Sequence, residues 1–259
     1  MKVLSWNLNH RSVESPQWDY FRELNPDIAL LQEANKIPTD ILSNYEVAFE
    51  CALNQSGDPV SYMKTGIAVK GKKLDSIDLF PKLLWAQKHE ELFHGSVLAR
   101  KVELTSGKIL NVVSVHSPAW HIDISDVNEN ELKGIRLTKS KKVWIADLLS
   151  YSLSNINDDE DWIVAGDFNL CEMLDKRPPG PNAEYLERME ECGWHECLRG
   201  TSGKLTPTYI SRTRAFQLDY MFVNKSFQLN LTNCYAENPE LIFRQKMSDH
   251  LPVVGEINF

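Results

Sequence analysis

The chain has 259 residues, of which 42% are hydrophobic and 25% charged, a composition typical of a globular protein with a sizeable core. Its formal charge of −8 excludes binding to nucleic acid or membrane mainly through bulk positive charge. It does not exclude a nucleic-acid enzyme, because lysines and a bound metal near a site offset the charge locally.

No stretch approaches the roughly 18 apolar residues of a membrane helix, and the first residues do not resemble a signal peptide. The chain has five cysteines, an odd number that fits reduced thiols. We therefore expect a cytoplasmic protein that does not bind membranes and forms one domain over residues 1–259.

Apolar runs and helical patterns predict mixed strands and helices along the whole chain. In chain order we expect a strand at Lys2–Leu8, a helix at Pro16–Leu24 with Ser15 as its N-cap, strands at Asp27–Gln32, Tyr45–Cys51, Thr65–Lys70, Ser96–Leu104 and Lys108–His116, a helix at Glu131–Leu153, a strand at Trp162–Asp167, a helix at Asn182–Cys192, and strands at Phe216–Val223, Leu229–Ala236 and Pro252–Ile257. Helices dispersed between strands, with a "TSGK" hairpin signal, indicate mixed sheets in an α/β fold.

Polar residues follow several of the predicted strands. Asn7, Glu33, His116 and Asp167 each come directly after or at the end of an apolar run. A carboxylate beside a buried strand is costly unless something binds it. Strand ends around one rim hold a site rigidly, so we expect these residues to converge.

The segment "WIVAGDFNL" carries two polar side chains one residue apart, Asp167 and Asn169. In an extended chain, residues i and i+2 point to the same side, so we expect both to face one ligand. Phe168 would then point the other way, into the core.

Two further carboxylates and a histidine complete the candidate set. Asp219 lies inside a predicted strand, and Asp249 and His250 precede the last one. A carboxylate beside His250 would favour the cationic imidazole, which stabilises charge on a phosphate. Oxygen ligands such as Glu33, Asn7 and Asp249 suit Mg²⁺ or Mn²⁺. Metal-assisted attack of water on a phosphoester uses all of these groups.

These motifs occur in a familiar order. "SWNLN", "LLQE", "VVSVHSP", "VAGDFNL", "FQLDYMFV" and "SDHLPV" span residues 5–254, and together they resemble the endonuclease/exonuclease/phosphatase (DNase I-like) superfamily. The resemblance implies a four-layer α/β sandwich of two packed mixed sheets flanked by helices, with the site at one rim.

The resemblance also implies roles for the residues. Glu33, Asn7 and Asp249 would hold the Mg²⁺ or Mn²⁺, and Asn9 would lie close to the substrate. Asp167 and Asn169 would orient or activate the attacking water. His116 would bind the phosphate, and Asp219 would pair with His250. The five expected catalytic residues are His116, Asp167, Asn169, Asp219 and His250.

The substrate class is less tightly constrained. The segment "TPTYISRTRAFQ" interleaves two arginines with two aromatic residues, which suits phosphate contact and base stacking along a nucleic-acid strand. The expected substrate-binding residues there are Tyr209, Arg212, Arg214 and Phe216.

We therefore expect a monomeric, metal-dependent phosphodiesterase, a nuclease acting on DNA or RNA, without an obligate protein partner. The alternative is a phosphatase or phosphodiesterase for a small-molecule or lipid phosphoester. Two motifs that inositol polyphosphate phosphatases usually carry are missing, and the loop "SPAWHIDISDVNENE" does not match AP endonucleases well.

Overall fold

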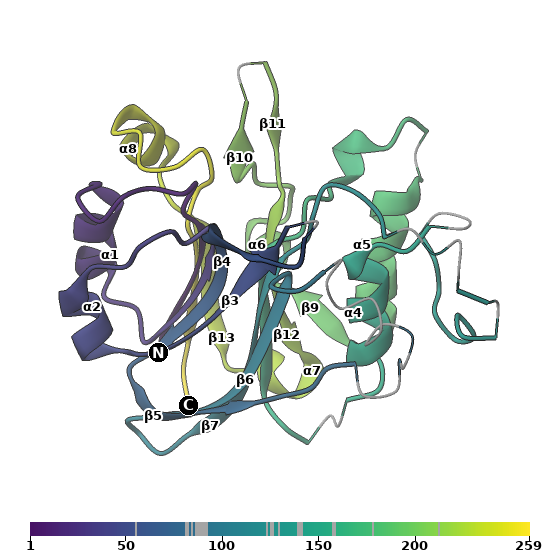
Figure 1. Cartoon of the computed structure of the whole chain (residues 1–259), viewed down its shortest axis with the longest axis horizontal. Helices are drawn as coiled ribbons and strands as arrows, with labels where there is room; N and C mark the ends of the chain where they lie inside the picture. The colour runs from purple at the N-terminus through teal and green to yellow at the C-terminus, as the bar shows by residue number, and fades with distance from the viewer. Residues whose placement is uncertain are drawn as a thin grey trace.

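The computed structural model describes the chain except residues 55, 81, 82, 84, 86–92, 123, 125, 126, 129, 139–141, 157, 158, 178 and 212. Apart from one two-stranded hairpin, the strands of the described part form two mixed six-stranded sheets that pack face to face, with helices on both outer faces (Figure 1). The predicted four-layer α/β sandwich is therefore confirmed.

The first sheet contains both chain ends and has the strand order β13–β14–β1–β2–β4–β3. Its strands are β1 (Lys2–Asn7), β2 (Ile28–Gln32), β3 (Glu46–Leu53), β4 (Pro59–Val69), β13 (Leu231–Ala236) and β14 (Val253–Ile257). Strands β1 and β2 are parallel, and β14 runs antiparallel to β1. The carboxyl ends of β1 and β2 therefore lie at the same rim as the start of β14.

The second sheet has the order β5–β6–β7–β8–β12–β9. Its strands are β5 (Gly71–Ser76), β6 (Val97–Leu104), β7 (Ile109–His116), β8 (Trp162–Asp167), β9 (Trp194–Glu196) and β12 (Asp219–Asn224). Here β7 and β8 are parallel and β12 runs antiparallel to β8, so His116, Asp167 and Asp219 lie level with one another in the sheet.

Hydrophobic clusters between the two sheets and under the outer helices hold the sandwich together. The inner faces of the two sheets enclose a core that includes Val3, Leu30, Val112, Ile163 and Met221. Helices α1 (Gln17–Leu24), α2 (Thr39–Asn44) and α8 (Pro239–Arg244) cover the first sheet, and α4 (Ile145–Leu153) and α5 (Pro181–Glu191) cover the second (Figure 1). The short helices α6 (Cys197–Ser202) and α7 (Lys225–Gln228) bring Leu198 and Phe227 into the inner core.

The predicted helix at Glu131–Leu153 is wrong over its first half. Among the described residues of this segment, the helix comprises only Ile145–Leu153, and Val143 pairs with Ile122 in an isolated β-bridge. Asp147 explains the late start, because its carboxylate accepts hydrogen bonds from the backbone N–H groups of Thr138 and Trp144. These bonds join Thr138 and Trp144 to the first turn of α4.

The predicted strand at Phe216–Val223 is also divided. Its first residue belongs to a two-stranded hairpin of β10 (Tyr209–Ile210) and β11 (Ala215–Phe216), which projects beyond the sheets in Figure 1. The helix predicted from Pro16 begins at Gln17, with Pro16 instead of Ser15 as the N-cap. None of the described helices is long and apolar enough to cross a membrane.

Candidate active site

The carboxylate of Glu33 lies at the rim where β1 and β2 of the first sheet and β8 of the second sheet end. Asn7 at the end of β1 donates from Nδ2 to Glu33 Oε1 at 3.1 Å and to Asp167 Oδ2 at 3.1 Å. One amide therefore joins the carboxylates that follow β2 and end β8. The structure therefore brings these strand ends together, as predicted.

The orientation of the Asn7 amide follows from its own contacts. Its Oδ1 accepts a hydrogen bond from the backbone N–H of Asn9 at 3.0 Å, so its NH₂ faces the two carboxylates. An NH₂ group donates hydrogen bonds and does not bind a cation. In this orientation Asn7 positions the carboxylates, and metal ligation by Asn7 stays a prediction.

Two histidines flank Glu33. His116 Nε2 lies 3.5 Å from Oε1, and His10 Nε2 lies 2.7 Å from Oε2. Burial disfavours ionisation of Glu33, but His116, Asn7 and His10 outweigh it and lower its pKa to about 2. Of the two histidines, His10 makes the shorter contact. Glu33 is thus an ionised, partly exposed carboxylate that suits a hard divalent cation.

Asp167 and Asn169 share one side for a reason different from the predicted one. Strand β8 ends at Asp167, and Asn169 has a left-handed φ of 49°, so the segment turns instead of continuing extended. The Asn169 N–H donates to Asp167 Oδ1 at 2.9 Å, and its side chain donates to the Ser117 carbonyl at 2.8 Å. Phe168 is buried as predicted, against Tyr220 and Phe222.

Gly166 allows β8 to lie close to β7 at this end. A Cβ atom at Gly166 would lie 1.9 Å from the backbone oxygen of Val115, and its φ of 154° disfavours other residues. Gly166 therefore allows the close approach of β7 and β8. This approach determines where Asp167 lies.

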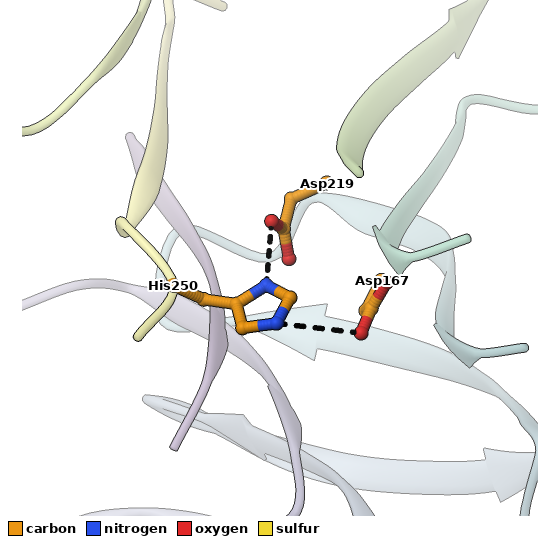
Figure 2. Close-up of side chains that lie close together, drawn as sticks. All are labelled: Asp167, Asp219 and His250. Carbon is orange, nitrogen blue, oxygen red and sulfur yellow. Dashed lines mark hydrogen bonds and ion pairs between the residues drawn. The ribbon is translucent and has the colours of Figure 1, made fainter. Parts of the chain in front are cut away.

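His250 lies between two carboxylates (Figure 2). Its Nδ1 is 2.8 Å from Asp219 Oδ2, and its Nε2 is 3.8 Å from Asp167 Oδ2. Burial disfavours the imidazolium, but the charge and hydrogen bond of Asp219 outweigh burial and raise the pKa of His250. Burial raises the pKa of Asp167, which makes it a better proton acceptor than an exposed aspartate.

Buried hydrogen bonds hold His250 against β1. Ser248 donates from Oγ to the backbone oxygen of Asn7 at 2.7 Å and accepts from the His250 N–H at 3.1 Å. Trp6 donates from Nε1 to the His250 carbonyl at 3.1 Å. These contacts link the two ends of the chain at the site, which no short sequence motif indicates.

Asp249 and Asn9 are linked to the site through backbone atoms. Asp249 is partly buried, and in the described part of the chain no hydrogen bond or ion pair joins its carboxylate to Glu33. Its backbone oxygen accepts from the N–H of Ile210, which ties the β10–β11 hairpin to the site. Asn9 touches the site through its backbone N–H. The metal and substrate roles of these two residues stay predictions.

The hairpin places two of the predicted substrate residues beside the site. The ring of Tyr209 lies 4.9 Å from the His250 ring, and Tyr209 pairs with Phe216 across the hairpin. Arg214 is exposed at its tip, and Arg212 lies outside the described residues.

A cavity of about 330 Å³ opens next to Asn169. Its walls combine aromatic and apolar side chains with a few amides and hydroxyls, and include Trp144, Phe168, Asn169, Tyr185, Tyr209 and Phe216. The sequence indicated neither this cavity nor His10. His10 stands one residue beyond "SWNLN", and only the turn after β1 brings it back to Glu33.

Two groups of residues would suit a cation. Ligand atoms of Asp167, Asp219 and His250 lie within 4.8 Å of one another, but all three residues are buried and His250 already pairs with Asp219. Glu33 is more accessible, with its side chain 20% exposed, and the Asn7 amide joins it to Asp167. The chemistry of the donors therefore favours Glu33 as the principal ligand.

Comparisons agree with this architecture. The model of the Endonuclease/Exonuclease/phosphatase family matches residues 4–250. No curated protein sequence matches the chain significantly.

Solved structures share the fold. An AP endonuclease from Archaeoglobus fulgidus is 17% identical with a TM-score of 0.66, and the match covers 100% of both chains. A 3′ phosphatase, NExo, from Neisseria bound to a product DNA hairpin is 16% identical with a TM-score of 0.66, again over 100% of both chains. The endonuclease domain of the retrotransposon TRAS1 is 16% identical with a TM-score of 0.64, over 100% of this chain and 98% of that one. With the family match over nearly its whole length, the chain belongs to the Endonuclease/Exonuclease/phosphatase family, whose members hydrolyse phosphoesters.

Proposed function

We propose that the protein is a divalent-metal-dependent phosphodiesterase that cleaves nucleic-acid strands by attack of water. The observation that carries this proposal is the single amide of Asn7, which lies 3.1 Å from both Glu33 and Asp167. It places an ionised carboxylate suited to a cation next to a buried carboxylate suited to accept a proton.

Glu33 would hold Mg²⁺ or Mn²⁺, with Asp249 and Asn7 nearby. When bound, the cation would stabilise negative charge on the phosphate as a Lewis acid. The lowered pKa of Glu33 supports this role, because the ligand is then ionised without needing to lose a proton.

Asp167 would accept the proton of the attacking water. Its Oδ2 accepts from the amides of Asn7 at 3.1 Å and Asn169 at 3.4 Å. Its Oδ1 accepts one bond, from the Asn169 N–H at 2.9 Å, which leaves a lone pair for water. Burial raises its pKa, which makes proton transfer to it more favourable. Asn169, anchored on the Ser117 carbonyl, would orient the water and the phosphate.

His250 would donate a hydrogen bond to a phosphate oxygen. Asp219 accepts from one side of the imidazolium, so Nε2–H remains for the substrate. The 3.8 Å between Nε2 and Asp167 Oδ2 exceeds a direct hydrogen bond, so Nε2–H is available to a phosphate oxygen and Asp167 to the attacking water. His116 would contact the phosphate from the Glu33 side.

The nucleic-acid part of the proposal depends on the hairpin and the cavity. Tyr209 and Phe216 line a cavity that reaches Asn169, so a ring entering it would lie beside the scissile phosphate. Base stacking on aromatic side chains is tolerant of sequence. Arg214 at the tip would contact the backbone of the same strand.

The test is a substrate panel with added Mg²⁺ or Mn²⁺: single-stranded DNA, duplex DNA, abasic duplex, RNA and phosphoinositides. The proposal predicts cleavage of at least one nucleic acid by the parent protein and loss of cleavage in Asp167→Asn. Turnover of phosphoinositides with no cleavage of any nucleic acid would overturn the proposal of a nuclease. It would support a small-molecule or lipid phosphoester as the substrate.

A further inference from the structure

His10 faces Glu33 more closely than any other described side chain of the site. Its Nε2 lies 2.7 Å from Glu33 Oε2, and its Nδ1 lies 2.9 Å from the backbone oxygen of Tyr62. The Tyr62 ring packs edge-on against the imidazole at 5.3 Å. The imidazole is therefore held on both sides, with one nitrogen facing the proposed metal ligand.

The contact with Tyr62 determines which nitrogen carries a proton. A carbonyl oxygen only accepts hydrogen bonds, so Nδ1 must be the donor. In the neutral imidazole, Nε2 then carries a lone pair directed at Glu33. Two acceptors 2.7 Å apart repel unless a proton or a cation lies with them. Histidines that bind metals commonly donate their other N–H to a backbone carbonyl, as His10 does.

The spacing also fits a shared cation. Ligands about 2.0–2.2 Å from one ion and at right angles to each other lie about 3 Å apart. The 2.7 Å between His10 Nε2 and Glu33 Oε2 is close to this value. Glu33 Oε1 is occupied separately by Asn7, so Oε2 is the oxygen available on the His10 side.

The backbone is strained where it aims these two side chains. Asn9, His10 and Glu33 have left-handed φ values of 46°, 53° and 49°, which residues other than glycine rarely adopt. The His10 N–H donates to the Glu33 carbonyl at 3.1 Å, so the strained turns support each other. Such strain gathers at functional sites, where surrounding contacts maintain it.

We propose that His10 is a ligand of the cation held by Glu33, and that this nitrogen gives the site a preference for Mn²⁺ and other transition metals over Mg²⁺. Imidazole binds first-row transition metals better than Mg²⁺, which favours oxygen ligands and retains its waters. This inference rests on the proposed function, because it takes Glu33 as the metal ligand.

The test compares metal binding in the parent protein, His10→Ala and His10→Gln. Mn²⁺ affinity is measured by electron paramagnetic resonance titration, and Mg²⁺ affinity by competition. His10→Ala is expected to weaken Mn²⁺ binding by about 10-fold or more and to change Mg²⁺ binding much less. His10→Gln, which offers an oxygen, is expected to lower the ratio of Mn²⁺ to Mg²⁺ affinity while it retains binding.

His195→Ala is the matched control. His195 lies on β9, which pairs with the end of β12 remote from Asp219, and its Nδ1 contacts Gln228. Its loss is expected to leave both affinities unchanged. Electron spin-echo modulation from ¹⁴N bound to Mn²⁺ should decrease in His10→Ala and persist in His195→Ala. Thermal unfolding of each variant confirms that it is folded.

Equal weakening of Mn²⁺ and Mg²⁺ in His10→Ala, or an unchanged nitrogen signal, would overturn the inference and leave His10 as an ion-pair partner of Glu33. Neither result depends on catalysis. Hydrolysis without this metal preference would refute the inference alone, whereas His10-dependent Mn²⁺ binding without hydrolysis would refute the proposed function alone.

Discussion

The imidazole Nε2 of His250 lies 3.8 Å from Oδ2 of Asp167, so the two side chains face each other without a direct hydrogen bond. They come from opposite sheets, His250 from the chain before β14 and Asp167 from the end of β8. Packing of the two sheets therefore sets the separation between a hydrogen-bond donor and a proton acceptor. A phosphate oxygen beside them would accept from His250, and the attacking water would donate to Asp167.

Removing the charge that supports His250 should slow the chemical step. Asp219→Asn retains a side-chain oxygen near Nδ1 but loses the carboxylate that stabilises the imidazolium. We expect kcat for bis-p-nitrophenyl phosphate to fall about 10²–10³-fold with little change in KM. Steady-state kinetics at saturating metal measure this, and an unchanged kcat would show that the charge on His250 is not used.

The β10–β11 hairpin should contribute more to the binding of a nucleic-acid strand than to the binding of a small phosphoester. Phe216→Ala removes a ring from the cavity beside Asn169. Stacking is worth about 1–3 kcal/mol per base, so we expect KM for a short oligonucleotide to rise about 10-fold or more. Hydrolysis of bis-p-nitrophenyl phosphate should fall less. Phe259→Ala, at an exposed terminal ring stacked on Phe227, serves as the control. Equal effects on both substrates would contradict strand binding by the hairpin.

A buried ion pair supports the wall of the same cavity. Arg188 Nη1 lies 3.1 Å from Asp147 Oδ1, and both side chains are almost fully buried. Arg188→Met would leave the Asp147 charge without its partner, so we expect the free energy of unfolding to fall by about 3–5 kcal/mol. Urea denaturation measures this.

The exposed Lys101–Glu160 pair is the control. Lys101→Ala should lower the free energy of unfolding by less than about 1 kcal/mol. If both substitutions cost the same, burial does not govern the contribution of the Arg188 pair. The double variant Asp147→Asn with Arg188→Met should lose less than the sum of the single losses.

Glu196 should make stability depend on pH. Burial raises its pKa to about 7, although it accepts hydrogen bonds from the N–H groups of Leu198 and Arg199 at the start of α6. Between pH 4.5 and 7 the folded state retains a proton that the unfolded chain has lost, so stability falls as pH rises through this window.

Glu196→Gln removes this titration. Its free energy of unfolding relative to the parent protein should rise by up to roughly 3 kcal/mol from pH 4.5 to 8. Urea denaturation across that range measures the difference. A difference independent of pH would show that Glu196 ionises in the folded state as readily as in the unfolded one.

Several site residues were predictable because a local pattern carries them. Glu33 follows the buried strand β2, and His116 and Asp167 are the last residues of β7 and β8. A parallel arrangement brings such strand ends to one rim. The four-layer fold was predictable from the dispersed strands and helices together with the family resemblance.

Other features depend on contacts distant in sequence. The apolar spacing before Ile145 is typical of a helix. Asp147 instead accepts from the backbone N–H of Thr138, and Arg188 donates to the carbonyl of Arg136, contacts that periodicity does not reveal. His10 reaches Glu33 only through a strained turn. The predicted single domain, monomeric state and cytoplasmic location stay predictions.

The most direct test of the proposed site compares two aspartates at opposite ends of one strand. Asp167 ends β8, whereas Asp161 precedes it and pairs with Lys108. With Mg²⁺ or Mn²⁺ present, Asp161→Asn should hydrolyse bis-p-nitrophenyl phosphate at about the rate of the parent protein, and Asp167→Asn should lose at least about 10²-fold in kcat. Equal activity in all three proteins, or no activity in the folded parent protein, would contradict the proposed mechanism.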